Sequence, residues 1–323
     1  MRTRTKVWLI IATSLVLIGC IIFGGVMTMF KWDFTKLSTV KYETNTYEIS
    51  EAFDCISINT GTADIAFAVS DTENCKVACH EETNAKHYVT VEDGTLVVEL
   101  INERSLYDFI GHIGLNFDTP KITIYLPKTK YTSLVIKEST GDIVIPKDFN
   151  FNNADISLST GDVDFSASAS EIIKIKTSTG DISVENISVG TLDLTVSTGK
   201  VTVSAVTCEN DVKVKVSTGK TKLTDTRCKN VISNGNTGDI YLSNVISTEK
   251  FSIKRSTGDV KFEDSDATEI FVKTDTGGVT GSLLNNKVFI TQTDTGKVDV
   301  PKTTNGGRCE ITTDTGDIKI TVK

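Results

Sequence analysis

Apolar and polar residues alternate around ten Thr-Gly pairs in the C-terminal part of the chain. The pairs are spaced by 19 or 20 residues, and this regularity indicates a structural repeat rather than chance. We call one repeat a rung and name it by its turn threonine. The turn threonines are Thr140, Thr160, Thr179, Thr198, Thr218, Thr237, Thr257, Thr276, Thr295 and Thr315.

Four positions of each rung are predominantly apolar. They stand six and four residues before the turn threonine, and three and five residues after it. The exceptions are Ser233, Thr291, Thr221 and Gly281. Because residues two apart on a strand share a face, this pattern predicts a strand, a turn and a second strand with one buried face.

A glycine follows every turn threonine, and Ser, Asn or Asp precedes it, which is typical of tight turns. Glycine is expected where φ is positive or where backbones approach closely. We therefore predict a structural role for one set of turn glycines. They are Gly141, Gly161, Gly180, Gly199, Gly219, Gly238, Gly258, Gly277, Gly296 and Gly316.

Such rungs are expected to stack in parallel about 4.8 Å apart. A single rung cannot bury its apolar face alone, so stability requires many copies. Residues 134–323 are thus predicted to form an all-β fold, a parallel β-solenoid of about ten rungs of 19–20 residues each.

Residues 44–133 carry strand signals without the regular repeat, and we predict a β-rich N-terminal cap there. Asn59-Thr60-Gly61 resembles a diverged first repeat, 80 residues before Thr140-Gly141. Asp93-Gly94 between two alternating segments predicts a hairpin turn.

The N-terminus predicts a membrane segment. Residues 1–6 form a basic tail, residues 7–30 carry no charge, and residues 31–43 form a linker. About 20 apolar residues span a bilayer as a helix, and the flanking positive charges favour a cytoplasmic N-terminus. Leu17-Ile18-Gly19-Cys20 matches a lipoprotein processing site, but the apolar run continues beyond Cys20, which favours an uncleaved transmembrane anchor. Both readings predict an extracytoplasmic body, and the uncleaved anchor makes the chain a single-pass protein of the cytoplasmic membrane.

The charge balance narrows the choice of partners. The chain has 34 Lys and Arg against 42 Asp and Glu. An acidic body argues against nucleic acid, whose phosphates require a basic surface. Seven cysteines in 323 residues are too few for a small disulfide scaffold.

The turns, the strand Lys121-Ile122-Thr123-Ile124-Tyr125-Leu126-Pro127 and the N-terminal anchor resemble one bacterial family. It comprises membrane-anchored β-strand-repeat proteins called putative adhesins, of unknown function and related to toast-rack-like domains. The resemblance covers nearly the whole chain and implies a solenoid ectodomain of the cell envelope. It implies no catalytic residues.

One charged column is the main candidate for surface chemistry. It follows the turn glycines and contains Asp142, Asp162, Asp181, Lys200, Lys220, Asp239 and Asp259. Stacked carboxylates suit Ca²⁺. The alternative, which we favour, is a ladder of solvated turn residues with local hydrogen bonds.

Other chemistry is weakly indicated. His80, His87 and His112, with Cys75 and Cys79, do not have the spacing of common zinc ligands. No cluster of acid and base groups recurs as polysaccharide cleavage requires. We therefore predict no enzyme, no cofactor and no metal.

The expected function is an extracytoplasmic binding or scaffold module that contacts an envelope protein or glycan. The alternatives are an envelope-stress sensing accessory that acts through a membrane partner and, less favoured, a cell-wall glycan enzyme. Cys208 and Cys228 both lie ten residues after a turn threonine, so they should stack on successive rungs. The pair is expected either as a disulfide or as two reduced thiols.

Overall fold

The computed structural model describes residues 3–33, 41–102 and 118–323. The chain divides into two compact units. One unit comprises residues 1–43, 81–86 and 102–119, and the other comprises residues 44–80, 87–101 and 120–323. The second unit contains the solenoid and is described below.

The first unit contains the single helix, α1 (Thr3–Met29). Its segment Thr5–Met29 is long and apolar enough to cross a membrane. At 1.5 Å per residue this segment is about 37 Å long, more than the roughly 30 Å of a hydrocarbon core. The helix is thus compatible with a membrane anchor or a signal sequence.

All other regular elements are strands. The N-terminal strands are β1 (Tyr42–Ile49), β2 (Cys55–Thr62), β3 (Asp64–Val69), β4 (Cys75–Glu82), β5 (Ala85–Glu92), β6 (Thr95–Asn102) and β7 (Lys121–Leu126). The next strands are β8 (Lys130–Thr140), β9 (Ile143–Ile145), β10 (Asn150–Thr160), β11 (Val163–Phe165), β12 (Ser168–Thr179), β13 (Ile182–Glu185), β14 (Ser188–Thr198), β15 (Val201–Cys208) and β16 (Asp211–Thr218). The last are β17 (Thr221–Thr237), β18 (Ile240–Thr257), β19 (Val260–Thr276), β20 (Val279–Leu283), β21 (Lys287–Thr295), β22 (Val298–Asp299), β23 (Gly307–Thr315) and β24 (Ile318–Val322).

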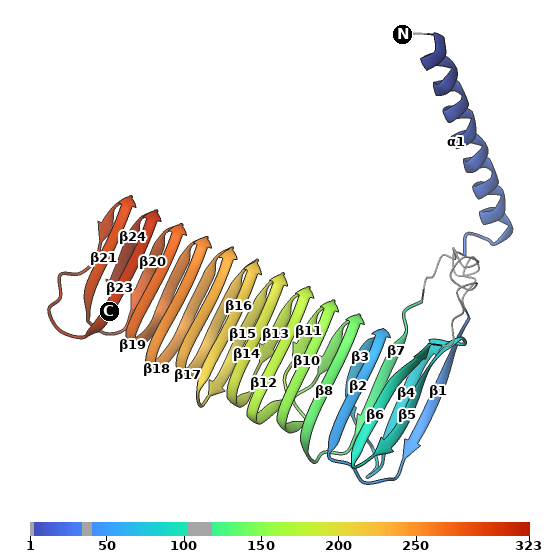
Figure 1. The fold of residues 1–323 in the computed structure, drawn as a ribbon, viewed down its shortest axis with the longest axis horizontal. Helices are drawn as coiled ribbons and strands as arrows, with labels where there is room; N and C mark the ends of the chain where they lie inside the picture. The colour runs from blue at the N-terminus through green and yellow to red at the C-terminus, as the bar shows by residue number, and fades with distance from the viewer. Residues whose placement is uncertain (1–2, 34–40, 103–117) are drawn as a thin grey trace. The chain divides into compact units, whose positions relative to one another are not determined.

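The strands stack in parallel with equivalent residues side by side (Figure 1). Thr160 of β10, for example, pairs with Thr140 of β8 on one side and with Thr179 of β12 on the other. This register confirms the predicted all-β fold, a parallel β-solenoid of about ten turns.

The four apolar columns form the core. In the rung of Thr198, for example, Leu192, Leu194, Val201 and Val203 are all fully buried. A further inward column stands two residues before the turn threonine and includes polar members such as Thr177 and Thr274. Their hydroxyls donate to the carbonyl oxygens of turn glycines in the preceding rungs, at 3.4 and 3.3 Å.

The turn glycines stack directly on one another. Their φ angles are positive, between 122° and 158°. A Cβ atom on Gly199 would lie 2.0 Å from the carbonyl oxygen of Gly180. Both the backbone angle and the contact with the neighbouring rung therefore require glycine at this position.

A second turn closes each rung, seven residues after the turn threonine. In several rungs the residue there has a left-handed backbone, with φ between 48° and 57°. These residues are Asn186, Ala205, Asp225, Asn244 and Asp264. Asn and Asp tolerate this conformation better than most side chains, which accounts for four of the five.

The first rung in the sequence is not the outermost rung in space. Strands β2 and β3 pair with β8 and β9 on one side and with β6 and β7 on the other. Strand β4 then runs antiparallel to β7 and pairs with it from Lys76 to His80. This end of the solenoid is therefore covered by a strand that belongs to the same chain.

The register of the first rung corrects one prediction. Thr62, not Thr60, pairs with Thr140, and Thr60 pairs with Glu138. The equivalent of the turn glycine is therefore Ala63 rather than Gly61. The interval to Thr140 is 78 residues, not 80. Asp93 and Gly94 do have the positive φ angles (46° and 73°) of a tight hairpin turn.

At the C-terminal end, too, the order of the rungs in space differs from their order in the sequence. Strand β23 pairs with β19 on one side and with β21 on the other, and β24 lies likewise between β20 and β22. The rung of Thr315 thus lies between the rungs of Thr276 and Thr295. Equal spacing along the sequence does not reveal this order, in which the last two rungs are exchanged.

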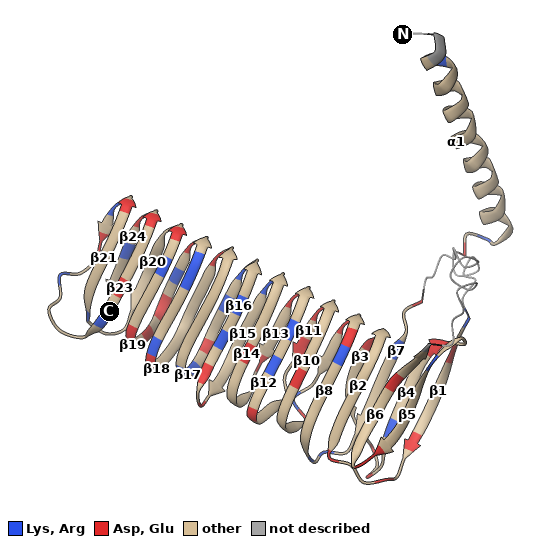
Figure 2. Ribbon diagram, viewed as in Figure 1, with Lys and Arg blue, Asp and Glu red and all other residues tan. Residues whose placement is uncertain are grey.

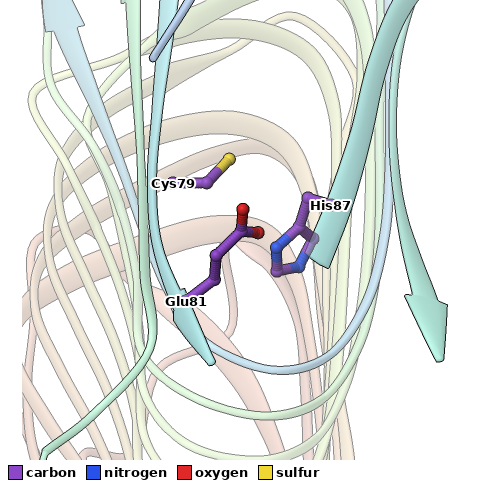
Figure 3. Close-up of side chains that lie close together, drawn as sticks. All are labelled: Cys79, Glu81 and His87. Carbon is purple, nitrogen blue, oxygen red and sulfur yellow. The ribbon is translucent and has the colours of Figure 1, made fainter. Parts of the chain in front are cut away.

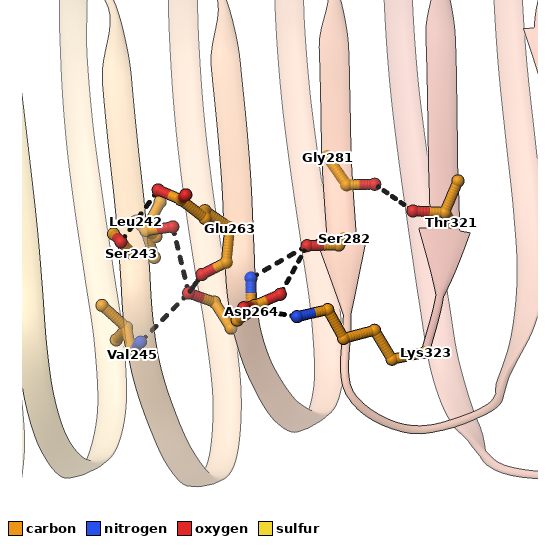
Figure 4. A network of polar contacts seen from close by, with 10 residues as sticks. Leu242, Ser243, Val245, Glu263, Asp264, Gly281, Ser282, Thr321 and Lys323 are labelled. Atoms are coloured by element: carbon orange, nitrogen blue, oxygen red, sulfur yellow. Dashed lines mark hydrogen bonds and ion pairs between the residues drawn. The ribbon is translucent and has the colours of Figure 1, made fainter.

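Polar contacts hold the inserted C-terminal strand in place (Figure 4). The Lys323 ammonium lies 2.6 Å from a carboxylate oxygen of Asp264, and Thr321 donates to the carbonyl oxygen of Gly281 at 3.2 Å. Ser282 donates to Asp264 at 2.9 Å. Lys323 and Ser282 together lower the pKa of Asp264 through hydrogen bonding. The second turn of the rung of Thr257 therefore binds the end of β24.

Candidate binding surface

Lysines recur on the outward face of the solenoid, three residues before the turn threonine. From the rung of Thr140 to that of Thr257, lysine and a small polar residue alternate in one continuous line of paired residues, and the next rung adds Lys273 directly beside Lys254. We define the lysine row as Lys137, Lys176, Lys215 and Lys254, with Ser157, Thr195 and Asn234 between them. All four lysines are exposed, and the pairing puts them about 9.6 Å apart, which is two rung spacings.

The adjacent outward column, five residues before the turn threonine, has balanced charges. Asp155, Lys174, Asp193 and Lys213 pair in sequence across neighbouring strands, and Lys174 lies 3.2 Å from Asp155. Figure 2 shows the two signs interspersed along the strands. Among the ion pairs of the described residues, none involves a member of the lysine row. Its charges are therefore available to a ligand.

A shallow groove of about 340 Å³ runs along the first part of the lysine row. Most of the residues that line it are polar: Asn59, Thr60, Lys137, Glu138, Ser139, Ser157, Leu158, Ser159, Lys176 and Ser178. Hydroxyl and ammonium groups provide hydrogen-bond donors, and the hydroxyls also accept. The groove suits a ligand that has many polar groups and negative charge.

The aspartates of the charged turn column have a different role. The Asp142 carboxylate accepts a hydrogen bond from the backbone N–H of Asp162 at 2.9 Å, and Asp162 does the same for Asp181 at 2.7 Å. The pattern extends from Asp64 to Lys200 and recurs between Asp239, Asp259 and Gly278. One carboxylate oxygen in each of these aspartates therefore satisfies a turn N–H of the next rung.

The two lysines of this column form ion pairs within it. Lys200 lies 3.7 Å from Asp181, and Lys220 lies 3.4 Å from Asp239. The column is thus a structural ladder that links rungs, and it gives no support to the alternative of a calcium ladder.

Two buried ionisable side chains occupy the inward column beside the turns. Glu138 accepts from the backbone N–H of Ala63 at 3.0 Å, and burial raises its pKa to about 8. Arg255 donates to the carbonyl oxygen of Val216 at 2.8 Å and to the Thr221 hydroxyl at 2.9 Å. A Cβ on Gly235 would lie 1.7 Å from the Arg255 guanidinium, so this glycine leaves the space that the arginine fills.

Cys208 and Cys228 are free thiols, and both are buried. The residues before them, Thr207 and Arg227, are paired on adjacent strands. Burial raises the pKa of Cys228 to about 12, and Cys208 adds to the rise. The predicted adjacency on successive rungs is therefore present.

Three buried side chains of the β4 and β5 strands lie together: Cys79, Glu81 and His87 (Figure 3). Each offers one ligand atom within 4.8 Å of the others. The Thr60 hydroxyl also lies 2.8 Å from Nε2 of His87. Structural zinc sites have four protein ligands, and three such residues converge among those described. The sequence analysis had not included Glu81, and His112 lies outside the described residues.

The fold and the stacked turns define a toast-rack type of β-solenoid. The chain belongs to the family described as Toastrack DUF4097, whose model matches residues 53–213 and 201–323. This membership confirms the resemblance inferred from the turns.

Solved structures provide similar chains. One is a putative adhesin from Bacteroides fragilis (16% identity, 87% of this chain and 97% of that chain covered, TM-score 0.44). Another is a putative lipid binding protein from Parabacteroides distasonis (19% identity, 76% and 95% covered, TM-score 0.48). A third is a putative cell adhesion protein from Clostridium sporogenes (15% identity, 88% and 100% covered, TM-score 0.24). No curated protein matches the chain.

The lysine row was missed in the sequence analysis, although the sequence contains its signal. Its members recur at intervals of 39 residues, from 137 to 176, 215 and 254. This interval is two rungs, so a search for single-rung regularity does not detect it.

Proposed function

We propose that this protein is an extracytoplasmic binding module that holds a linear anionic polymer of the cell envelope along the lysine row. The observation that supports the proposal is a line of four exposed lysines without ion pairs among the described residues, regularly spaced on a rigid sheet. Each exposed contact is worth at most about 1 kcal/mol, so useful affinity requires several in register. A polymer with repeated phosphate or carboxylate groups meets that requirement, and a small anion does not.

Helix α1 would display the module. The basic stretch Arg2 to Lys6 precedes the apolar segment, which favours a cytoplasmic N-terminus and an extracytoplasmic solenoid. Protease added to intact protoplasts should then remove residues 40–323. Full protection of these residues would refute the extracytoplasmic placement.

Binding is tested with the full chain in detergent, using poly(glycerol phosphate) and polygalacturonate as anionic probes and dextran as the neutral one. We expect binding to both polyanions, weakened by salt because the charges are exposed. Replacing all four lysines of the row by Gln should weaken binding about thirtyfold, if each contributes about 0.5 kcal/mol.

In the matched control, Gln replaces four other lysines that are exposed or ion-paired: Lys174, Lys213, Lys222 and Lys261. Both variants have the same net charge, so a general electrostatic effect would weaken binding equally in the two. Equal weakening, or equal binding of dextran, would contradict the proposal. Binding that requires α1 and a second membrane protein would instead favour the sensing accessory. Catalysis has no part in the proposal.

A further inference from the structure

The outermost rung at the C-terminal end, the rung of Thr295, exposes residues that are buried elsewhere. Val298 is 45% exposed, whereas its equivalents Val279 and Ile318 in the two preceding rungs are fully buried. Ile290 and Val288 on the outward face are 48% and 37% exposed. An open end of the core and an apolar outer face thus meet at β21.

Strand β21 also has a free edge. It pairs with β23 on one side, and no register between described strands joins its other edge. The segment from Val288 to Thr293 contains no charge and is rich in β-branched and aromatic residues. A long, uncharged edge strand is a site at which another strand adds.

The other end of the solenoid shows how such an edge is completed. There, β4 lies antiparallel to β7 and pairs through five residues, with Lys76 opposite Tyr125 and His80 opposite Lys121. An antiparallel strand is therefore compatible with the end of this stack. The C-terminal end lacks an equivalent strand within the described residues.

We propose that β21 of a second copy of this chain completes the edge, antiparallel to the first and related to it by a two-fold axis. The loop after β22 sets the register, because the Thr303 hydroxyl donates to the carbonyl oxygen of Lys287 and occupies the start of the edge. The free part is 288–294, and a two-fold axis at its centre passes next to Thr291.

This register is self-complementary. It places Ile290 opposite Gln292 of the second copy and Phe289 opposite Thr293. The one charge in the segment, Asp294, lies opposite Val288, so no like charges face each other. A two-fold interface is closed, since each free edge is used once and no further copy can add. The proposal is independent of polymer binding by the lysine row.

The oligomeric state of the full chain in detergent tests the proposal. Light scattering after size-exclusion chromatography should give the mass of a dimer. Ile290→Lys places like charges near the axis on an exposed position and should give a folded monomer with an unchanged circular dichroism spectrum. Val144→Lys, at an exposed position in β9 away from the edge, should remain a dimer.

Cross-linking tests the register. In a Cys20→Ser, Cys55→Ser background, Thr291→Cys should form a disulfide-linked dimer on mild oxidation, because paired Cα atoms in antiparallel strands lie about 4.5–5.5 Å apart. Val144→Cys should not. A monomeric wild-type chain at about 100 μM, where the edge would be saturated for any Kd in the micromolar range, would overturn the proposal. A dimer that persists in Ile290→Lys without cross-linking at residue 291 would also overturn it, since association would then lie elsewhere.

Discussion

The rungs of Thr198 and Thr295 follow the same sequence pattern in different surroundings. In the rung of Thr198, both flanking rungs cover the core residues, and Val201 is fully buried. In the rung of Thr295, one flank is open, and the equivalent Val298 is 45% exposed. In a stacked fold a residue is therefore buried by the neighbouring rungs as much as by its own rung. The stability that an apolar residue of the repeat contributes thus depends on the position of its rung in the stack.

The largest expected difference concerns the turn glycines. Gly199→Val introduces a Cβ 2.0 Å from the carbonyl oxygen of Gly180, at a φ of 146°. We expect it to destabilise the solenoid by more than about 4 kcal/mol, because strain and a backbone clash combine. Chemical denaturation of the full chain in detergent, followed by circular dichroism, measures the effect.

Gly296→Val in the outermost rung is the matched control. The same clash arises there with Gly316, at 2.1 Å, but the rung can move outward without disturbing another one. Its midpoint should fall less than that of Gly199→Val. Equal losses of stability would mean that the cost of replacing a turn glycine does not depend on the position of its rung in the stack.

The next largest effect is expected at the ion pair that holds the outermost rung. The Lys287 ammonium lies 2.6 Å from Asp266, and both side chains are almost fully buried. Lys287→Ala leaves the aspartate buried without its cation, which costs about 3–5 kcal/mol. Lys302→Ala removes an exposed lysine from the following loop and should leave the same melting curve unchanged.

A matched pair of valines tests burial directly. Val201→Ala removes two buried methyl groups and should cost about 2 kcal/mol, whereas Val298→Ala at the equivalent exposed position should cost less than about 1 kcal/mol. The Ile290→Lys background keeps the chain monomeric for both measurements. A larger loss at Val298 would show that the end of the solenoid is covered in the monomer.

The smallest effect is expected in the pH dependence of the free energy of unfolding, and it arises from Glu138 in the rung of Thr140. The pKa of Glu138 is raised by burial from 4.5 to about 8. The folded state thus holds this proton more tightly than the unfolded state does, so the stabilisation is complete below about pH 4.5 and is lost as the pH rises through 8. We expect the free energy of unfolding to fall by about 1–2 kcal/mol from pH 6 to pH 8.

Glu138→Gln keeps an oxygen for the Ala63 N–H and removes the titration, so the pH slope should flatten. Glu185→Gln, at an exposed position, is the control and should keep it. A wild-type slope of the opposite sign would contradict a protonated Glu138.

The core columns and turns could be predicted because each depends on contacts that repeat at a fixed interval. The inward column that contains Thr177 and Thr274 could not, because these residues are polar and are satisfied by carbonyl oxygens of another rung. The order of the last rungs was hidden by equal spacing.

The candidate surface was predictable only in part. The charged turn column was found from the sequence, but its function as a ladder of acceptors for backbone N–H groups depends on distances between rungs. The lysine row needed the pairing that places Lys137 in line with Lys176. Convergence of Glu81 with Cys79 and His87 depends on the hairpin, which spacing alone does not specify.

At both ends of the solenoid, the order of the rungs in space differs from their order in the sequence. The displaced elements, β2 and β3 at one end and β23 and β24 at the other, are separate from the rungs between Thr160 and Thr257. Gene duplication can lengthen that middle region without rebuilding either end.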